Sequence, residues 1–259
     1  MLETSGAPFE QGHAQGTACA GGIARAAADL RRQYGFGIWR LTLSEIRLGA
    51  GRQVRRHTPQ LHERLEGIAA GAGVQVGALQ LFDAQARLAG VGTAGKESLE
   101  ARLEIPDELG RLLLLRNSRP DAGGFDSVEL TCAAWAGCLA GVNAAGLGAI
   151  VIEDRAPDAP SLRVLAQNLI FRRDALGSAL DHLDHRASYT GATGVLHLVA
   201  PGCEAVRVDL QEGRIEVSEL PAVDAPIAES TVRLDAAARS LEWSAPEGGS
   251  ERAVCRAAE

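Results

Sequence analysis

The order of its apolar segments limits what this chain can fold into more than any other feature does. A helical first third is followed by short strand-like runs with glycines between them, then by two helices, and then by further strands. Strands grouped on both sides of a helical pair indicate sheets that are covered by helices. The sequence therefore predicts a layered α+β fold.

The first third carries helical patterns. Residues 10–33 are rich in Ala, Arg and Gln, which are all compatible with a helix. Residues 57–73 place Leu61 and Leu65 on one face at helical spacing, and glycines close that segment. Residues 74–90 follow as another short helix, so we expect the two to form a helical hairpin.

The expected strands lie before and after a helical pair at residues 160–173 and 174–186. The run RLLLLRN at 111–117 is continuously apolar in its first part, which is typical of a strand buried on both faces. The last dozen residues have no such pattern and are expected to be loose. The other expected strands are 127–135, 137–143, 146–154, 194–200, 205–210, 214–220, 230–235 and 239–245.

Composition excludes several classes of function. The 259 residues form one large domain, or a core with an appendage, and they carry a net charge of −7. Such a charge argues against a nucleic-acid groove. There is no apolar run long enough to span a membrane and no signal-peptide pattern at the start, so we expect no membrane partner. Five cysteines without a CxxC pair are typical of free thiols in the cytoplasm.

Four segments, taken in order, resemble the acyl-coenzyme A:6-aminopenicillanate acyltransferase family of N-terminal-nucleophile hydrolases. They are GAPFEQGHAQG (6–16), the helical residues 63–89, GRLLLLRNSRP (110–120) and AGCLAGVNAAGLGAIVIED (136–154). The resemblance covers most of the chain, and the order and spacing of the segments are its most specific part.

The resemblance implies a four-layer αββα sandwich with an N-terminal helical segment. Residues 1–92 would correspond to a pro-segment and residues 93–259 to the sandwich core. Family members cut themselves before a cysteine, whose thiol then attacks an amide or thioester with its own α-amine as the base. Backbone and Asn donors stabilise the oxyanion, and no cofactor is expected.

The chain departs from this family at the residues that would carry out the reaction. The nucleophilic cysteine would fall within residues 96–101, which contain none. The family has an Asp where this chain has Arg119. A later His-Thr-Asn-His segment has no counterpart here. We therefore expect the chain to stay uncut, with its N-terminal segment still attached.

Several residues are candidates to replace the missing thiol. Ser98 could serve as the nucleophile if cleavage freed its amine, or it could simply lie near the start of a strand. Lys96, the only lysine, could be nucleophilic if burial lowered its pKa, although its neighbours favour a solvated position. Cys132 and Cys138 could be reactive thiols or small core residues.

The sequence supports a metal site less well than it supports a nucleophile. Asp181 and His185 lie at i, i+4 on an expected helix and could share a metal, but the sequence provides no third ligand. The same helix reads equally well as amphipathic, with these residues on its polar face. We expect no metal.

The remaining candidate site residues come from the two matched strands. The resemblance implies that Asn117 and Asn143 position the substrate or the oxyanion, and Asn143 could also stabilise a hairpin turn. Arg116 and Arg119 flank Asn117 and are expected to bind the substrate.

Two interpretations of the function follow. The chain could be a divergent acyltransferase or amidohydrolase that acts on, or binds, an acyl amide or thioester. Alternatively, it could be a catalytically inactive pseudoenzyme that serves as a binding module or as the partner subunit of an active relative. The expected partners are a small-molecule acyl substrate and further subunits, in a homo- or hetero-oligomer.

Overall fold

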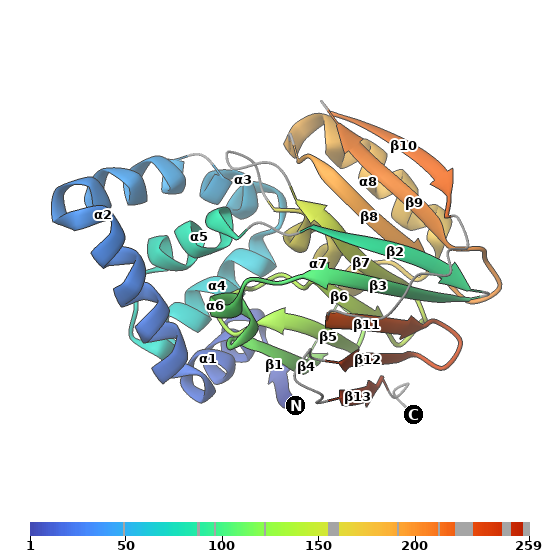
Figure 1. Ribbon diagram of the computed structural model, residues 1–259, viewed down its shortest axis with the longest axis horizontal. Coiled ribbons are helices and arrows are strands. Elements are labelled where there is room, and N and C mark those ends of the chain that lie inside the picture. The colour runs from blue at the N-terminus through green and yellow to red at the C-terminus, as the bar shows by residue number, and fades with distance from the viewer. Residues whose placement is uncertain are drawn as a thin grey trace.

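The structure is a computed structural model that describes residues 1–48, 50–86, 89–95, 97–121, 123–154, 161–190, 192–211, 213–220, 230–244 and 250–255. The described strands form two sheets (Figure 1). The large sheet has the order β1-β4-β5-β6-β7-β8-β9-β10 and the small sheet the order β13-β12-β11-β3-β2. Neighbouring strands are antiparallel, except that β1 runs parallel to β4.

The strands of the large sheet are β1 (Leu2–Gly6), β4 (Leu113–Pro120), β5 (Ser127–Cys132), β6 (Ala140–Asn143), β7 (Gly148–Asp154), β8 (Gly194–Val199), β9 (Val206–Gln211) and β10 (Arg214–Glu219). Those of the small sheet are β2 (Ala89–Gly95), β3 (Ser98–Glu104), β11 (Ser230–Asp235), β12 (Ser240–Ser244) and β13 (Ser250–Val254). Both sheets have apolar inner faces, so the main core lies between them.

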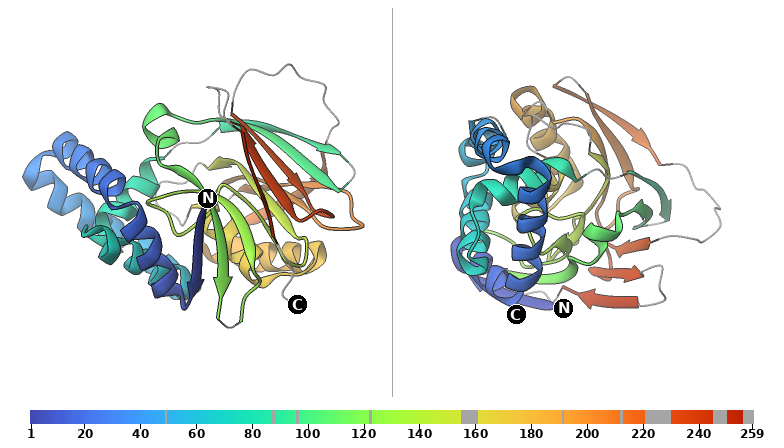
Figure 2. Two further views of the ribbon diagram at one scale, coloured as in Figure 1. Left: turned by 90° about the horizontal axis from the view of Figure 1, so that it is seen from below. Right: turned by 60° about the vertical axis from the view of Figure 1, so that its left-hand side comes forward.

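The large sheet is covered on both faces. Helices α7 (Leu162–Arg172) and α8 (Leu176–Thr190) pack on one face, and the small sheet packs on the other (Figure 2, left view). A second apolar cluster fills the space between these helices and the large sheet. The α+β class is thus confirmed, with strands and helices in the order that the apolar segments indicate.

A helix layer over the small sheet, which the four-layer sandwich would require, does not occur within the described residues (Figure 2). The strands of the small sheet explain this difference. In β3 the side chains of Leu99, Ala101 and Leu103 are buried, while the alternating Glu100 and Arg102 are partly exposed. A strand that alternates in this way presents one face to the core and the other to water, so its outer face needs no cover.

The N-terminal helices lie beside the sheets rather than over them (Figure 1). They are α1 (Pro8–Ala18), α2 (Ala20–Leu48), α3 (Ala50–His57), α4 (Pro59–Ala72) and α5 (Val76–Gln85), and a short α6 (Asp107–Gly110) precedes β4. Helices α4 and α5 meet at Gly73, whose positive φ of 68° ends α4, so the predicted pair of helices with its glycine turn is confirmed. No single described helix has the length and hydropathy needed to cross a membrane, and one bent pair, α4 with α5, meets that test only when taken together.

Helices α1 and α4 pack backbone against backbone. A Cβ atom on Gly12 or Gly16 would collide with carbonyl groups of α4, and one on Gly67 or Gly71 would collide with carbonyl groups of α1. Glycines four residues apart on both helices therefore allow the axes to approach closely. This contact fixes α1 next to the large sheet, where the polar cluster described below is found.

Three segments differ from the sequence-based expectation. Residues 2–6 form β1, and residues 89–95 form β2 rather than the end of a helix. The expected loose C-terminus contains β13, which pairs with β12. These strands carry few apolar side chains, so backbone pairing selects their conformation, with the distant β4 for β1 and with the neighbouring β3 and β12 for β2 and β13. The expected domain boundary at residue 92 falls inside β2, and β1 belongs to the large sheet.

Candidate functional site

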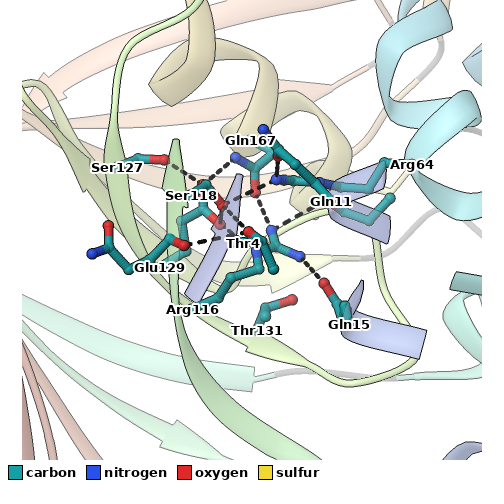
Figure 3. Close-up of polar contacts among 12 residues, drawn as sticks. Thr4, Gln11, Gln15, Arg64, Arg116, Ser118, Ser127, Glu129, Thr131 and Gln167 are labelled. Carbon is teal, nitrogen blue, oxygen red and sulfur yellow. Dashed lines mark hydrogen bonds and ion pairs between the residues drawn. The ribbon is translucent and has the colours of Figure 1, made fainter. Parts of the chain in front are cut away.

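A cluster of buried polar side chains lies where the N-terminal helices meet the large sheet (Figure 3). We call it the polar cluster. Its residues come from β1, α1, α4, β4, β5 and α7, so it joins segments that are far apart in the sequence. The polar cluster consists of Thr4, Gln11, Gln15, Arg64, Arg116, Ser118, Ser127, Glu129, Thr131 and Gln167.

Arg116 is the centre of this cluster. Its side chain is completely buried, and its Nε donates to Glu129 Oε2 at 2.5 Å. The terminal nitrogens donate to the carbonyls of residues 135 and 136 and to the amide oxygens of Gln15 and Gln167, at 2.6 to 3.4 Å. A guanidinium has five N–H donors, and all five are used inside the protein.

Glu129 is equally well satisfied. Its Oε1 accepts from Ser127 and from the Gln167 amide, and its Oε2 accepts from Arg116 and from Ser118. Burial would raise the pKa of Glu129, but Arg116, Arg64 and these hydrogen bonds hold the pKa below its usual range. The carboxyl group is therefore an anion that stabilises Arg116, and it is a poor general base.

The N-terminal helices close the cluster. From α1, Gln15 donates to the carbonyls of Ala133 and Trp135 at 2.9 and 3.1 Å. From α4, the Arg64 guanidinium donates to Gln11 and, at 3.0 Å, to Ser118. Burial and the nearby Arg116 lower the pKa of Arg64 to about 9. Helices α1 and α4 thus contribute side chains to the cluster itself and do not merely lie over it.

Asn117 and Arg119 point to the other side of β4. Asn117 lies opposite Glu3 in the β1–β4 register and donates to both oxygens of that carboxylate, at 3.0 and 3.1 Å. Arg119 lies 3.7 Å from the same carboxylate, and its side chain is 54% exposed. The predicted trio of Arg116, Asn117 and Arg119 is therefore divided, because neighbouring residues of a strand face opposite sides.

Asn143 has a structural position. Its amide nitrogen donates to the carbonyls of Ile170 and Arg173, and its Oδ1 accepts from the backbone N–H groups of Ala145 and Leu147. The side chain is fully buried. Both amide protons are engaged, so Asn143 links the end of α7 to the β6–β7 turn and has no donor left for an oxyanion.

Ser98 lies in the other sheet from the polar cluster. It is the first residue of β3 and pairs with Gly95 and Asp235. Glu97, before it, has a positive φ of 59° and accepts from the N–H of Gly202 at 2.7 Å. The candidate Lys96 lies outside the described residues. No described contact joins Ser98 to a general base.

The thiols of Cys132 and Cys138 are fully buried. Burial raises the pKa of Cys132 to about 12. Burial and the neighbouring Glu129 raise the pKa of Cys138 still further. Thiols of this kind are protonated at neutral pH and do not act as nucleophiles. Their positions favour the interpretation that they are core residues.

A metal-binding arrangement is not found among the described residues, which contain no group of three or more His, Cys, Asp or Glu side chains that could hold an ion. Both Asp181 and His185 lie on the exposed side of α8, as an amphipathic helix predicts.

His197 was not singled out from the sequence. It lies on β8 between the two sheets, directly against Gly92, where a Cβ atom would collide with the imidazole ring. Its side chain is 1% exposed, and neither ring nitrogen has a hydrogen-bond partner among the described residues. Burial and the nearby Arg207 lower its pKa to about 4, so the ring is neutral.

Sequence reasoning also missed Glu129, Gln167 and Arg64. A signal for Glu129 was present, because a single carboxylate interrupts the otherwise buried strand SVELTC. A lone charge in such a strand requires a buried partner. The pairing with Arg116 depends on the β4–β5 register, which cannot be read from the sequence. Neither a protein-family model nor a curated protein matches the chain.

Proposed function

We propose that this chain is an uncut, catalytically inactive protein built on a scaffold related to the acyl-coenzyme A:6-aminopenicillanate acyltransferases. It acts by binding, either to an acyl amide or thioester or to an active subunit, and it does not transfer the acyl group. The two stacked sheets with α7 and α8 on the large one support this relationship. The solvated outer face of the small sheet departs from the four-layer arrangement.

One observation carries the proposal. Arg116, which we expected to bind the substrate, directs all five of its donors to protein acceptors. Side chains of α1 and α4 complete that network, so the N-terminal segment is part of the closed site, whereas the resemblance implies that an active relative cuts it from the core. A site that is closed and fully hydrogen-bonded offers no group to a reacting carbonyl.

The free thiols support a location in a reducing compartment, and we propose the cytoplasm. All five cysteines are free thiols, and three of them are buried. A chain of this kind does not rely on disulfides for its stability.

The intact mass of the purified protein under denaturing conditions tests whether the chain is uncut. We expect a single species of 27.1 kDa. Two fragments that separate near residues 95–98 would revive Ser98 as a freed nucleophile and overturn the proposal.

A panel of acyl amides and thioesters tests whether the protein binds or turns over its ligand. We expect at least one of them to raise the melting temperature without being consumed. Consumption that disappears in the Ser98→Ala variant would show an enzyme instead. Consumption that survives in Ser98→Ala but disappears in Arg116→Lys would identify a divergent acyltransferase that uses the polar cluster.

A further inference from the structure

The outer face of the small sheet carries a row of alternating charges, which we call the charge row. It crosses β3, β11, β12 and β13, which lie side by side (Figure 1). The strand registers place each member directly opposite the next, in the order Glu100, Arg233, Glu242 and Arg252. The signs along the row therefore alternate, beginning with a negative charge on β3 and ending with a positive charge on β13.

The members of the charge row do not form ion pairs with one another in the described part of the chain. Glu242 Oε1 instead accepts from Ser250 at 3.1 Å, and Arg252 Nη2 donates to Ser240 at 3.3 Å. Both arginines are exposed and both glutamates are partly exposed. Most of the hydrogen-bonding capacity of these four side chains is therefore available to a second molecule.

The same face also carries exposed apolar groups. Val91 on β2 and Val254 on β13 lie on it, and each is at least half exposed. No helix covers this face within the described residues, as both views in Figure 2 show. Charges of both signs between apolar edges are a composition that suits contact with another protein surface.

The charge row is complementary to itself. A two-fold axis parallel to the strands, midway between β11 and β12, places β11 of one copy over β12 of the other and β3 over β13. Glu100 then faces Arg252 of the second copy, and Arg233 faces Glu242 of the second copy. A symmetric dimer uses the same patch on both copies, so each of these contacts occurs twice.

Other positions of the axis are unfavourable. An axis along β11 would place Arg233 over its own copy and Glu100 over Glu242, and like charges that meet across an interface repel. An axis along the row itself would place every charge over its own copy. An axis in the gap on either side leaves at least one charge without a facing strand. The alternation of signs therefore selects one arrangement.

The rows next to the charge row are compatible with this arrangement. The registers place Arg102 over Ser250 of the second copy, and Asp235 over Ser240 of the second copy. Neither of these two rows brings like charges together. Sheets that stack face to face lie about 10 Å apart, a distance that glutamate and arginine side chains from the two copies can bridge.

The area of the face sets the strength of such a dimer. The small sheet has five strands of five to seven residues. At about 4.8 Å between strands and about 3.3 Å per residue, its outer face covers roughly 500 Å² on each copy. The two copies together would bury about 1,000 Å², which is at the small end of specific interfaces. We therefore expect a weak and reversible dimer.

We propose that the outer face of the small sheet is the interface of a homodimer, in which the charge rows of two copies pair across a two-fold axis between β11 and β12. The occupant of this face is thus a second copy of the same chain. The interface is separate from the polar cluster and goes beyond the proposed function, because neither depends on the other.

Sedimentation velocity over a range of protein concentrations tests the dimer. We expect the mass to rise reversibly from 27.1 kDa toward twice that value. A rise in salt from about 0.05 M to about 0.5 M should weaken the association, because it screens the paired charges. Arg233→Glu places two carboxylates against each other and should weaken dimerisation by about tenfold or more. Arg214→Glu, on exposed β10, is the matched control and should dimerise like the wild type.

Mixing two variants separates an interface from a folding defect. Alone, Arg233→Glu brings carboxylates together and Glu242→Arg brings guanidiniums together, so each should be mainly monomeric. In a mixture of the two, every charge of one row faces an opposite charge of the other, and we expect dimers to return. A single chain that carries both substitutions should dimerise for the same reason.

Three results would overturn the proposal. The first is a wild-type protein that remains monomeric at about 1 mM, since even a weak specific interface associates at that concentration. Such a face is simply solvated, or it takes a different partner. The second is a dimer that Arg233→Glu and Arg214→Glu affect equally. The third is a mixture of Arg233→Glu and Glu242→Arg that remains as monomeric as its two components.

Discussion

Arg116 and Glu129 lie directly opposite each other in the register of β4 and β5, with Nε and Oε2 2.5 Å apart and both side chains completely buried. Removing two charges from water costs several kcal/mol per ion, and only good geometry with further hydrogen bonds offsets it. Here the other polar groups of the cluster supply those bonds. The pair therefore orients the junction between the N-terminal helices and the large sheet.

Removing one partner of this pair should be strongly destabilising. Glu129→Leu leaves the guanidinium of Arg116 buried without its carboxylate, and we expect a loss of about 3–5 kcal/mol in the free energy of unfolding. Urea titration measures it. The double variant Arg116→Met/Glu129→Leu should lose less than Glu129→Leu alone, because the cluster then keeps one buried cation, Arg64, instead of two. As the control, Arg119→Ala removes an exposed ion pair and should cost less than about 1 kcal/mol.

The glycine contact between α1 and α4 should not tolerate a methyl group. In Gly16→Ala the new Cβ collides with the carbonyl of Ile68, so the helices must separate at a cost of about 1–3 kcal/mol. Gly21→Ala is the matched control, since it lies in α2 with no atom near the added carbon. That control should be neutral, or more stable by up to about 1 kcal/mol, owing to helix propensity. Similar losses for both variants in thermal unfolding would argue against close packing of the backbones.

The cysteines should differ sharply in reactivity. Cys203 is exposed, whereas Cys132 and Cys138 are fully buried, with raised pKa values. We expect a maleimide reagent to label Cys203 first in the native protein and to reach Cys132 and Cys138 only after denaturation. Mass spectrometry of the digested protein identifies the labelled positions. Rapid native labelling of Cys138, with Cys203→Ser as the background, would indicate an accessible thiol beside Arg116 and Glu129.

His197 should make the protein sensitive to mild acid. Its pKa is about 4 in the folded protein, below the value of about 6.5 for an unfolded chain. The unfolded state therefore binds the proton more readily, so stability is full above pH 6.5 and falls as the pH is lowered toward 4, by about 3 kcal/mol for this group.

The variant His197→Met removes this dependence. Because the buried ring has no hydrogen-bond partner among the described residues, we expect little loss at neutral pH and a flatter pH profile. Part of the slope should remain, since His182 has a lowered pKa as well. His13→Gln, which replaces an exposed imidazole, is the matched control for the loss of a histidine. Denaturant unfolding at pH 7 and at pH 4.5 measures the difference.

The sequence by itself determined the order of most elements. Helical spacing at Leu61 and Leu65 predicts α4, the glycine at 73 ends it, and continuous apolar runs predict the central strands. These features are local, because side-chain periodicity and turn chemistry act over a few residues. The absence of a cysteine from residues 96–101 is also a property of the sequence alone.

Only the tertiary structure decided which side chains meet. Strand β2 has the sequence AGVGTAG, which predicts no secondary structure. It forms a strand because its backbone pairs with β3. The β4–β5 register places Glu129 against Arg116, and the strand alternation sends Asn117 to the opposite side. The sequence shows only that the glycines of α1 and α4 are four residues apart. The folded structure shows that they allow the two helices to pack closely. Register and packing are set by contacts between separate segments, and the pattern within one segment carries no information about which residues of another segment it meets.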